Sequence, residues 1–306
     1  MMENLALVVP TKDRPEDLGR MLASLASQTR LPDHIIVVDA SSPPIEHVLS
    51  NFPALNIEYV RVFPPSLAVQ RNAGMARLRE NATLAGYLDD DVVLEPGAVE
   101  AMLRFWENAG ANVGGAAFNI VNNPAPRWIA LKRVFGIDDN PRGRMLASGF
   151  PTTICDVRND LETDWLYGGA TVWRRDVINT FPYDEWFVGT GFMEDVDYSF
   201  GVRSCYRLFV VANARLAHYS RPVRSDRQHL LGLWQVVNRM YFVRKYRDRG
   251  LSKISATWAT LGLILLNSGL ALIRADKNYL KRAIGNISGL AAVISGRSRQ
   301  FGGHLK

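Results

Sequence analysis

The first 88 residues alternate short apolar runs with amphipathic helical patterns, and this alternation restricts the fold more than any other feature of the chain. Runs of buried-strand length occur at Leu5–Val9, His34–Asp39, Ile57–Val62 and Leu84–Leu88. Helical patterns separate them, one beginning at Pro15 and one covering Ser66–Asn81. Strand, helix and strand at this spacing indicate parallel strands joined by right-handed crossovers. We therefore predict an α/β fold with a mostly parallel, Rossmann-like sheet flanked by helices.

Three consecutive carboxylates follow the fourth apolar run, in the sequence Y-L-D-D-D-V-V-L over Tyr87–Leu94. Neighbouring carboxylates raise each other's pKa unless a cation or hydrogen-bond donors hold them ionised. A bound divalent metal is one explanation, and an acidic turn at the end of a strand is the other. Ligands of parallel α/β sheets bind at the carboxyl ends of the strands, which here also carry Thr11, Asp13 and Asp39.

A second acidic cluster, Glu194-Asp-Val-Asp197, follows the glycines of Gly189-Thr-Gly191 and begins an amphipathic pattern. Carboxylates at a helix N-terminus are kept ionised by the helix dipole, which suits a general base. The alternative is ordinary helix-start composition. His218 comes 23 residues after Asp195; a single histidine is usually structural, but together with aspartates it can complete a metal site of oxygen and nitrogen ligands.

Two further stretches suggest ligand contacts. The segment from Asn122 to Asp160 has little periodicity, and we expect it to shape an acceptor pocket. After it, the glycine pair Gly168-Gly169 permits close backbone approach to a ligand, or else forms a bend in a core strand. The aromatic residues around this pair suit the apolar faces of a sugar, namely Trp165, Tyr167 and Trp173.

Seven motifs, taken in order, resemble those of the inverting family 2 glycosyltransferases of the GT-A fold. They are V-V-P-T-K-D-R-P, V-V-D-A-S-S, Q-R-N-A-G, Y-L-D-D-D, W-L-Y-G-G-A-T-V-W-R-R, M-E-D-V-D and A-H-Y. The resemblance covers about residues 5 to 220 and is similar in flavour to bacterial rhamnosyl and galactofuranosyl transferases of surface polysaccharide assembly. It implies transfer from a nucleotide-sugar donor (UDP-, dTDP- or GDP-linked) to a lipid-linked or polysaccharide acceptor.

The same resemblance implies roles for individual residues. Residues around the donor nucleotide would be Pro10, Thr11, Arg14, Asp39, Arg71, Asp89 and Asp90. Asp91 and His218 would bind Mg²⁺ or Mn²⁺ at the diphosphate, and Asp195 would be the base that deprotonates the acceptor. Residues meeting the acceptor or the sugar would be Trp165, Gly168, Gly169 and Glu194.

Two other functions compete with this interpretation. A nucleotidyltransferase also carries metal-binding aspartates on such a sheet, but it normally begins with a glycine-rich basic phosphate loop. This sequence has neither GxGxxG after its first strand nor GxxxxGK[ST]. A non-catalytic membrane or nucleic-acid adaptor on a transferase fold would leave Asp91, Asp195 and His218 unexplained.

The net charge is divided unevenly along the chain. Residues 1–220 contain 20 Lys or Arg and 27 Asp or Glu, whereas residues 221–306 contain 16 and 3. We predict a catalytic domain over 1–220 and a basic helical tail over 221–306 that seeks an anionic membrane surface rather than nucleic acid. Residues 221–253 read as a basic amphipathic helix, and Ile254–Ile273 has no charge over 20 residues. Because both its flanks are basic, we expect interfacial helices or a shallow hairpin rather than a span. A hairpin that pairs two copies of the chain is the alternative.

The location follows from the cysteines and the N-terminus. Cys155 and Cys205 are far apart in sequence and match no disulfide framework, so we expect thiols in a reducing compartment. The first apolar run is too short for a signal peptide. We predict a cytoplasmic protein held at the inner face of the cell membrane.

Overall fold

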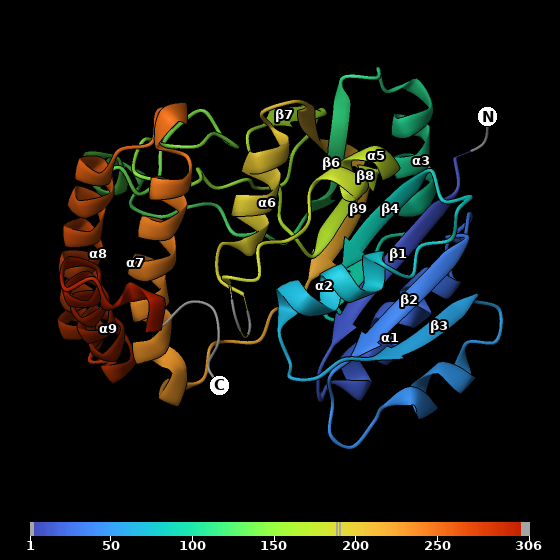
Figure 1. The fold of residues 1–306 in the computed structure, drawn as a ribbon, viewed down its shortest axis with the longest axis horizontal. Helices are drawn as coiled ribbons and strands as arrows, with labels where there is room; N and C mark the ends of the chain where they lie inside the picture. The colour runs from blue at the N-terminus through green and yellow to red at the C-terminus, as the bar shows by residue number, and fades with distance from the viewer. Residues whose placement is uncertain (1–2, 188, 190, 301–306) are drawn as a thin grey trace. The chain divides into compact units, whose positions relative to one another are not determined.

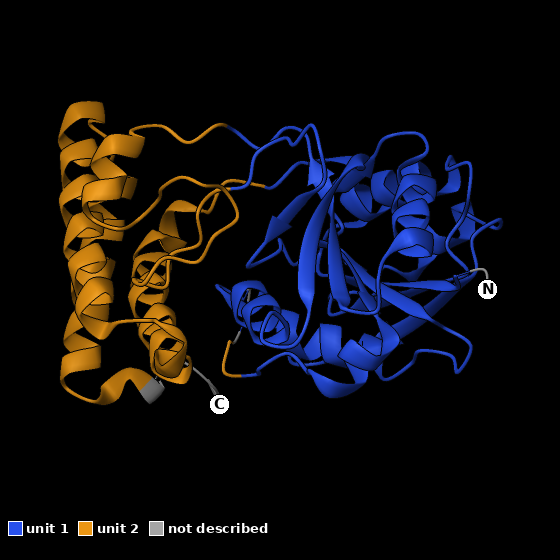
Figure 2. Ribbon diagram, turned by 90° about the horizontal axis from the view of Figure 1, so that it is seen from above, with its two compact units in different colours: residues 1–124, 154–185, 189–220 blue, residues 125–153, 186–188, 221–306 orange. Residues whose placement is uncertain are grey.

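The structure is a computed structural model that describes residues 3–187, 189 and 191–300. The chain forms two compact units, shown in blue and orange in Figure 2. The first unit comprises Met1–Pro124, Ile154–Glu185 and Gly189–Ser220, and the second comprises Ala125–Thr153, Trp186–Val188 and Arg221–Lys306. The polypeptide therefore passes between the units five times.

The first unit is an α/β layer structure (Figure 1). Its strands are β1 (Leu5–Thr11), β2 (His34–Asp39), β3 (Ile57–Arg61), β4 (Leu84–Leu88), β5 (Val92–Leu94), β6 (Val113–Ile120), β7 (Leu161–Thr163), β8 (Ala170–Arg174) and β9 (Arg207–His218). Its α-helices are α1 (Pro15–Ala26), α2 (Leu67–Met75), α3 (Ala98–Asn108), α5 (Arg175–Thr180) and α6 (Glu194–Val202). The four strands predicted in the first 88 residues are all present, so the α/β class is confirmed.

The sheet has a parallel half and a mixed half. Among the described residues its strand order is β3-β2-β1-β4-β8-β6-β9-β5, with β7 paired to β9. Strands β3, β2, β1 and β4 are parallel to one another, whereas β8 runs antiparallel to both β4 and β6. The long strand β9 is parallel to β6 and antiparallel to β5 and β7. The sheet is thus less uniformly parallel than predicted, because β8 is inserted between β4 and β6 in the antiparallel direction and β9 pairs antiparallel with β5 and β7.

Helices cover both faces of this sheet. On one face, α1 and α3 bury Leu18, Leu22, Met102 and Trp106 against alternate strand residues, which builds the main apolar core. On the other face lies α2, at the point where Gly74 meets Val8 of β1. A Cβ added to Gly74 would come within 2.3 Å of the Val8 side chain, so this helix packs on the strand only because the glycine has none. The predicted helix over Ser66–Asn81 is correspondingly shorter and ends at Met75.

The second unit is built on three long helices, α7 (Gln228–Lys245), α8 (Lys253–Arg274) and α9 (Lys277–Ile294). Helices α7 and α9 approach closely, because a Cβ on Gly232 would lie 2.2 Å from the carbonyl oxygen of Arg282. The apolar side of α7 is buried in this packing, so the helix expected to be amphipathic and basic forms the centre of the unit. By length and composition, α8 is the one described helix that could cross a membrane.

The insertion at 125–153 belongs to the same unit and contains the short helix α4 (Ile129–Val134). Its second half rests on α7: Arg239 donates to the carbonyl oxygen of Gly149 at 3.0 Å, and its guanidinium covers the ring of Phe150. A separate short piece adds Trp186, whose ring stacks on Tyr241 with centroids 4.3 Å apart. The unit is therefore assembled from three parts of the sequence.

Candidate functional site

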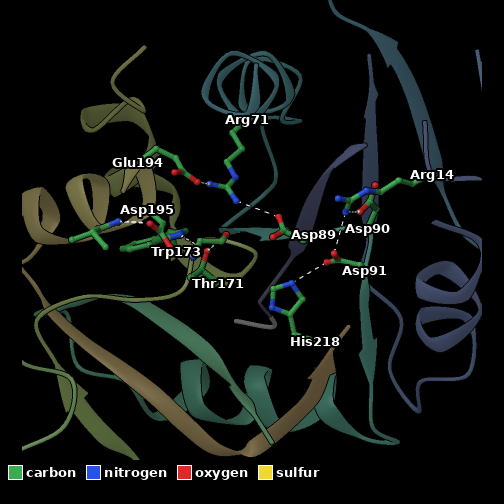
Figure 3. A network of polar contacts seen from close by, with 12 residues as sticks. Arg14, Arg71, Asp89, Asp90, Asp91, Thr171, Trp173, Glu194, Asp195 and His218 are labelled. Atoms are coloured by element: carbon green, nitrogen blue, oxygen red, sulfur yellow. Dashed lines mark hydrogen bonds and ion pairs between the residues drawn. The ribbon is translucent and has the colours of Figure 1, made fainter. Parts of the chain in front are cut away.

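The three aspartates form the turn between β4 and β5, at the carboxyl end of the parallel strands. The backbone N–H of Asp89 donates to the carbonyl oxygen of Gly169 before β8, and the carbonyl oxygen of Asp91 accepts from Tyr219 after β9. The turn is thus fixed to both neighbouring strands, and its side chains point toward a cluster of basic groups (Figure 3).

Asp90 and Asp91 are linked to the first strand by Arg14. Its Nη1 lies 3.0 Å from Asp90 Oδ1 and 3.0 Å from Asp91 Oδ2, and the Thr11 hydroxyl donates to Asp90 Oδ2 at 2.7 Å. Burial raises the pKa of Asp90 to about 6, although Arg14 and Thr11 act in the opposite direction. The predicted donor residues Thr11, Arg14 and Asp90 therefore form one contiguous group.

His218 completes a set of potential metal ligands. Strand β9 pairs His218 with Val92, which brings its Nε2 to 2.9 Å from Asp91 Oδ1. One ligand atom each from Asp89, Asp91 and His218 lie within 4.8 Å of one another. Two carboxylate oxygens and one imidazole nitrogen are a donor set that suits Mn²⁺ or Mg²⁺. The predicted metal residues are thus brought together, and Asp89 joins them.

The pKa shifts in this cluster show how its charges balance. Burial opposes ionisation of Asp91, but His218 and Arg14 outweigh it and lower its pKa. Burial likewise acts to lower the pKa of His218, and the carboxylates Asp91 and Asp89 more than offset it, so that the net pKa is raised. Asp91 is held ionised by the cationic side chains of His218 and Arg14, and a metal ion would take over that role.

Arg71 connects this cluster to the second acidic group. Its side chain is 1% exposed, with Nη2 at 3.2 Å from Asp89 Oδ1 and Nη1 at 2.9 Å from Glu194 Oε1. The rings of Tyr87 and Tyr183 lie 5.7 and 5.1 Å from the guanidinium carbon. A buried guanidinium is stable only when paired, and here two carboxylates and two aromatic faces surround it.

Asp195 is the second residue of α6, after Glu194, and remains partly exposed. Its Oδ2 accepts from the backbone N–H of Gly168 at 3.2 Å and its Oδ1 from that of Val196 at 2.8 Å. Burial raises its pKa, while Arg71 and these two donors limit the rise. A carboxylate with a raised pKa and some exposure is suited to accept a proton near neutral pH.

The glycine pair lies between the two acidic groups and leaves room for them. A Cβ on Gly169 would fall 2.0 Å from Asp89 Oδ2, and one on Gly168 would fall 2.6 Å from the Cβ of Asp195. No other residue type fits beside both carboxylates. The glycine pair therefore leaves the space that the side chains of Asp89 and Asp195 occupy. Its contact with a sugar stays a prediction.

A comparison with protein families shows which family the chain belongs to. The sequence model described as Glycosyl transferase family 2 matches residues 6–180, more than half of the chain. The chain belongs to this family. Recognition of family 2 from the ordered motifs is thereby confirmed.

One curated relative and two solved transferases are also similar to the chain. A stretch of 39 residues is 54% identical to the galactofuranosyltransferase GlfT1 of Mycobacterium tuberculosis, which amounts to 13% of this chain and only 13% of that relative's length. The mannosyltransferase PcManGT from Pyrobaculum calidifontis, solved with GDP-Man and Mn²⁺, aligns over 96% of this chain and 87% of its own, with a TM-score of 0.58 and 14% identity. GalNAc-T7, solved with UDP, GalNAc and Mn²⁺, aligns over 80% and 50%, with a TM-score of 0.52 and 16% identity. The structural likenesses establish a shared GT-A fold.

Three residues predicted for the site of this family 2 protein are buried. Trp165 is only 4% exposed and packs edge-on against Tyr167, and its contact with a sugar stays a prediction. Pro10 is buried within β1. Asp39 is fully buried, with one oxygen accepting from the Ser41 N–H and the other from the Tyr59 hydroxyl. These bonds lower the pKa of Asp39 despite its burial.

Three residues that shape the site were not identified from the sequence, namely Gln70, Asn72 and Tyr183. Gln70 donates to the carbonyl oxygens of Thr11 and Val38, which anchors α2 to the ends of β1 and β2. Tyr183 covers Arg71 and is held through Asn72, whose side chain bonds to both its N–H and its carbonyl oxygen. Gln70 and Asn72 flank Arg71 in Q-R-N, so the motif contained the signal for both, whereas Tyr183 has no local signature.

A cavity of about 530 Å³ lies apart from these residues in the same unit. It is lined by α3, β6 and β9, including Phe105, Arg207 and Phe209. Its lining includes neither the aspartate turn nor Asp195, so it is not the site built by the acidic groups.

Replacing Glu194 with glutamine should reduce the pH dependence of stability. Burial and then the adjacent Asp195 raise the pKa of Glu194 to about 8, against the influence of Arg71. The native state then keeps a proton that the unfolded chain releases near its ordinary pKa of 4.5, so this stabilisation is complete below that pH and is lost as pH rises through about 8. Tm measured from about pH 5 to pH 9 should therefore fall less in Glu194→Gln than in the wild type. An equal fall of Tm in the variant and the wild type would contradict the raised pKa of Glu194. Glu95→Gln, which alters an exposed ion pair with Arg215, serves as the control.

Proposed function

We propose that this chain is an inverting glycosyltransferase that moves a sugar from a nucleotide-sugar donor to a lipid-linked or polysaccharide acceptor, with Mg²⁺ or Mn²⁺ as cofactor. The observation that carries the proposal is the joining of two acidic groups by Arg71, one able to hold a cation and the other able to accept a proton. Catalysis is assigned to residues 1–220 and membrane association to residues 221–306.

The metal would be held by Asp91 and His218, with Asp89 beside them. The set fits because its three ligand atoms are already grouped within 4.8 Å, and because His218 and Arg14 lower the pKa of Asp91 and so keep this carboxylate ionised. When bound, such an ion neutralises the charge that develops on a departing diphosphate. The likeness to folds solved with GDP-Man or UDP and Mn²⁺ supports a nucleotide-sugar as donor.

The chain's own residues supply the remaining steps. Arg14 is the most exposed cation of the cluster and can turn from Asp90 toward a phosphate oxygen. Asp195 takes the proton of the acceptor hydroxyl while that oxygen bonds to the anomeric carbon and the bond from this carbon to the diphosphate breaks. Attack opposite the leaving group inverts the anomeric configuration. Arg71 holds Asp89 and Glu194 in place and keeps the charge around Asp195 balanced.

The acceptor and location follow from the basic second unit. Its three segments contain 21 Lys or Arg and five Asp or Glu. A positive surface next to an apolar helix favours the anionic inner face of the cell membrane, where a lipid-linked acceptor would be presented. Assembly of two copies through this unit is the alternative use of the same helices.

A donor screen tests the function directly. Thermal unfolding with UDP, dTDP or GDP and Mn²⁺ should raise Tm for one nucleotide, because a ligand that binds only the native state stabilises it. The matching nucleotide-sugar should then be cleaved to nucleoside diphosphate, and the transferred sugar should show inverted configuration by NMR.

The products separate the rival functions. Release of pyrophosphate would identify a nucleotidyltransferase, and binding without turnover of any donor would favour an adaptor. A product with retained configuration would overturn the direct displacement with Asp195 as base.

A further inference from the structure

Helix α8 presents an apolar stripe that is largely exposed among the described residues of its unit. Ile254, Leu265 and Leu272 are 84%, 61% and 84% exposed, and Trp258 and Leu261 are nearly half exposed between them. These residues recur every three or four positions, or two turns apart, along one side of the helix. The opposite side carries the buried Ala256, Ala259, Thr260 and Asn267. The stripe is therefore the outer side of a packed helix.

The short helix α4 extends this stripe. Trp258 Nε1 donates to the carbonyl oxygen of Val134 at 2.9 Å, and its ring lies 5.3 Å from that of Phe135. A Cβ on Gly262 would be 2.3 Å from Phe135, so the two segments are tightly packed. Beside this contact α4 exposes three apolar side chains about one turn apart, Trp128, Leu131 and Val134.

We call the combined surface the α4–α8 face. It consists of Trp128, Leu131, Val134, Ile254, Trp258, Leu261, Leu265 and Leu272. Eight exposed large apolar side chains on two contacting helices exceed what scattered surface residues of a soluble protein explain.

The charges next to the α4–α8 face are of one sign. Residues 125–137 and 253–275 include no Asp or Glu, and their charged residues are Arg127, Lys132, Arg133, Lys253 and Arg274. Acidic residues come just outside these two segments: Asp139 pairs with Arg133, and Asp276, after Ala275, caps the start of α9. An apolar stripe with cationic flanks and two exposed tryptophans complements an anionic bilayer. The tryptophan rings and the aliphatic parts of the Lys and Arg side chains would enter the membrane interface, and the charged ends would contact lipid phosphate groups.

We propose that the α4–α8 face is the surface that docks on an anionic lipid bilayer, with α8 lying in the interface and α4 inserted beside it. This rests on the membrane association included in the proposed function and identifies its surface. It also gives residues 125–135 a lipid contact, where the sequence predicted an acceptor loop.

An interfacial position for α8 follows from its inner side. Asn267 Nδ2 donates to Asn286 Oδ1 of α9 at 3.0 Å, and both residues are buried. A spanning α8 would have to leave α9 and Phe135 and expose Asn267 and Thr260 to acyl chains. Unpaired polar groups in hydrocarbon are costly, so docking the existing outer side is favoured.

Vesicle flotation of the full-length chain tests the proposal. Vesicles of phosphatidylcholine with about one third phosphatidylglycerol should bind the wild type, and pure phosphatidylcholine should bind it less, because cationic flanks add to apolar burial. Val134→Glu on α4 and Leu265→Glu on α8 should each lower the partition coefficient about tenfold or more. Phe63→Glu is the matched control, since Phe63 of the first unit is 56% exposed, close to Val134 at 63%, and should change nothing.

A second measurement does not depend on charge insertion. Brominated phosphatidylcholine should quench the tryptophan fluorescence of the bound protein, and Trp128→Phe and Trp258→Phe should each reduce the quenched fraction. Loss of binding by Leu265→Glu but not by Val134→Glu, with quenching unchanged in Trp128→Phe, would overturn the role of α4. Failure of the wild type to bind anionic vesicles would reject a lipid bilayer as the partner of the α4–α8 face. This holds whether the protein is then a monomer or a dimer that the Glu variants dissociate.

The donor site provides an independent readout. Nucleoside diphosphate binding in solution should be the same in all these variants and the wild type. Failure of glycosyl transfer alongside normal vesicle binding would reject only the proposed reaction, whereas normal transfer to a soluble acceptor without vesicle binding would reject only the docking surface.

Discussion

Asp195→Asn is expected to lower the rate of sugar transfer by about 10²- to 10⁴-fold, the range typical for loss of a general base. Asparagine keeps the size of the side chain and its bond from the Val196 N–H, but it no longer accepts the hydroxyl proton. Metal-dependent binding of the nucleoside diphosphate should be nearly intact, because the site that holds the cation is built from other residues. Turnover measured on one preparation tests the loss of rate, and calorimetric titration of the nucleoside diphosphate on the same preparation tests whether donor affinity is kept.

Asp197→Asn is the matched comparison, since Asp197 is a buried carboxylate in the same first turn of α6. It should affect turnover only as far as it affects folding, which Tm reports. If Asp195→Asn turned over at close to the wild-type rate while Asp197→Asn or Glu194→Gln did not, the base would be assigned to the wrong carboxylate.

Asp91→Ala is expected to abolish the gain in nucleotide affinity that Mn²⁺ provides. The variant loses a metal ligand and the carboxylate that pairs with both His218 and Arg14; Arg14 keeps Asp90 as a partner, whereas the ion pair of His218 with Asp91 is removed. Loss of an outer-shell group typically costs 10- to 100-fold in metal affinity, so loss of a ligand should cost about 100-fold or more. Calorimetric titration of UDP or GDP with and without Mn²⁺ measures the difference.

Glu95→Gln removes a carboxylate at the end of β5 that pairs with Arg215 of β9, and it should leave the Mn²⁺ effect unchanged. His218→Ala should reduce the effect in the same direction as Asp91→Ala. A Mn²⁺ effect that survives Asp91→Ala and disappears in Asp89→Ala would transfer the principal metal contact to Asp89.

The parallel half of the sheet was predictable because its information is local. Each of the first strands is a continuous apolar run bounded by polar turns, and each intervening helix has its own periodicity. The mixed half depends on pairing over long distances, as between β6 and β9, and no short window of sequence encodes such a register. Helix α2 was extended too far because its end depends on the packing of Gly74 against Val8, a tertiary contact.

The site was predicted unevenly for a related reason. Asp91 and His218 meet because β5 pairs with β9, so only the family resemblance could join residues so far apart in sequence. The role of Trp165 stays a prediction, because an aromatic residue beside glycines has the same sequence signature whether it binds a sugar or fills a core. For Asp39, the chain's own N–H and hydroxyl groups already satisfy both oxygens, which no count of acidic residues reveals.

The five passages of the chain between its units limit how family members can exchange parts. A chimaera that replaces only the C-terminal helices would place a foreign α8 against the resident Phe135 and a foreign α7 against the resident Gly149 and Trp186. Exchange should succeed only when the insertion, the short piece at Trp186 and the helices are transferred together. Gain of the second unit during divergence would accordingly require coordinated change at three places in the gene rather than the addition of a terminal extension.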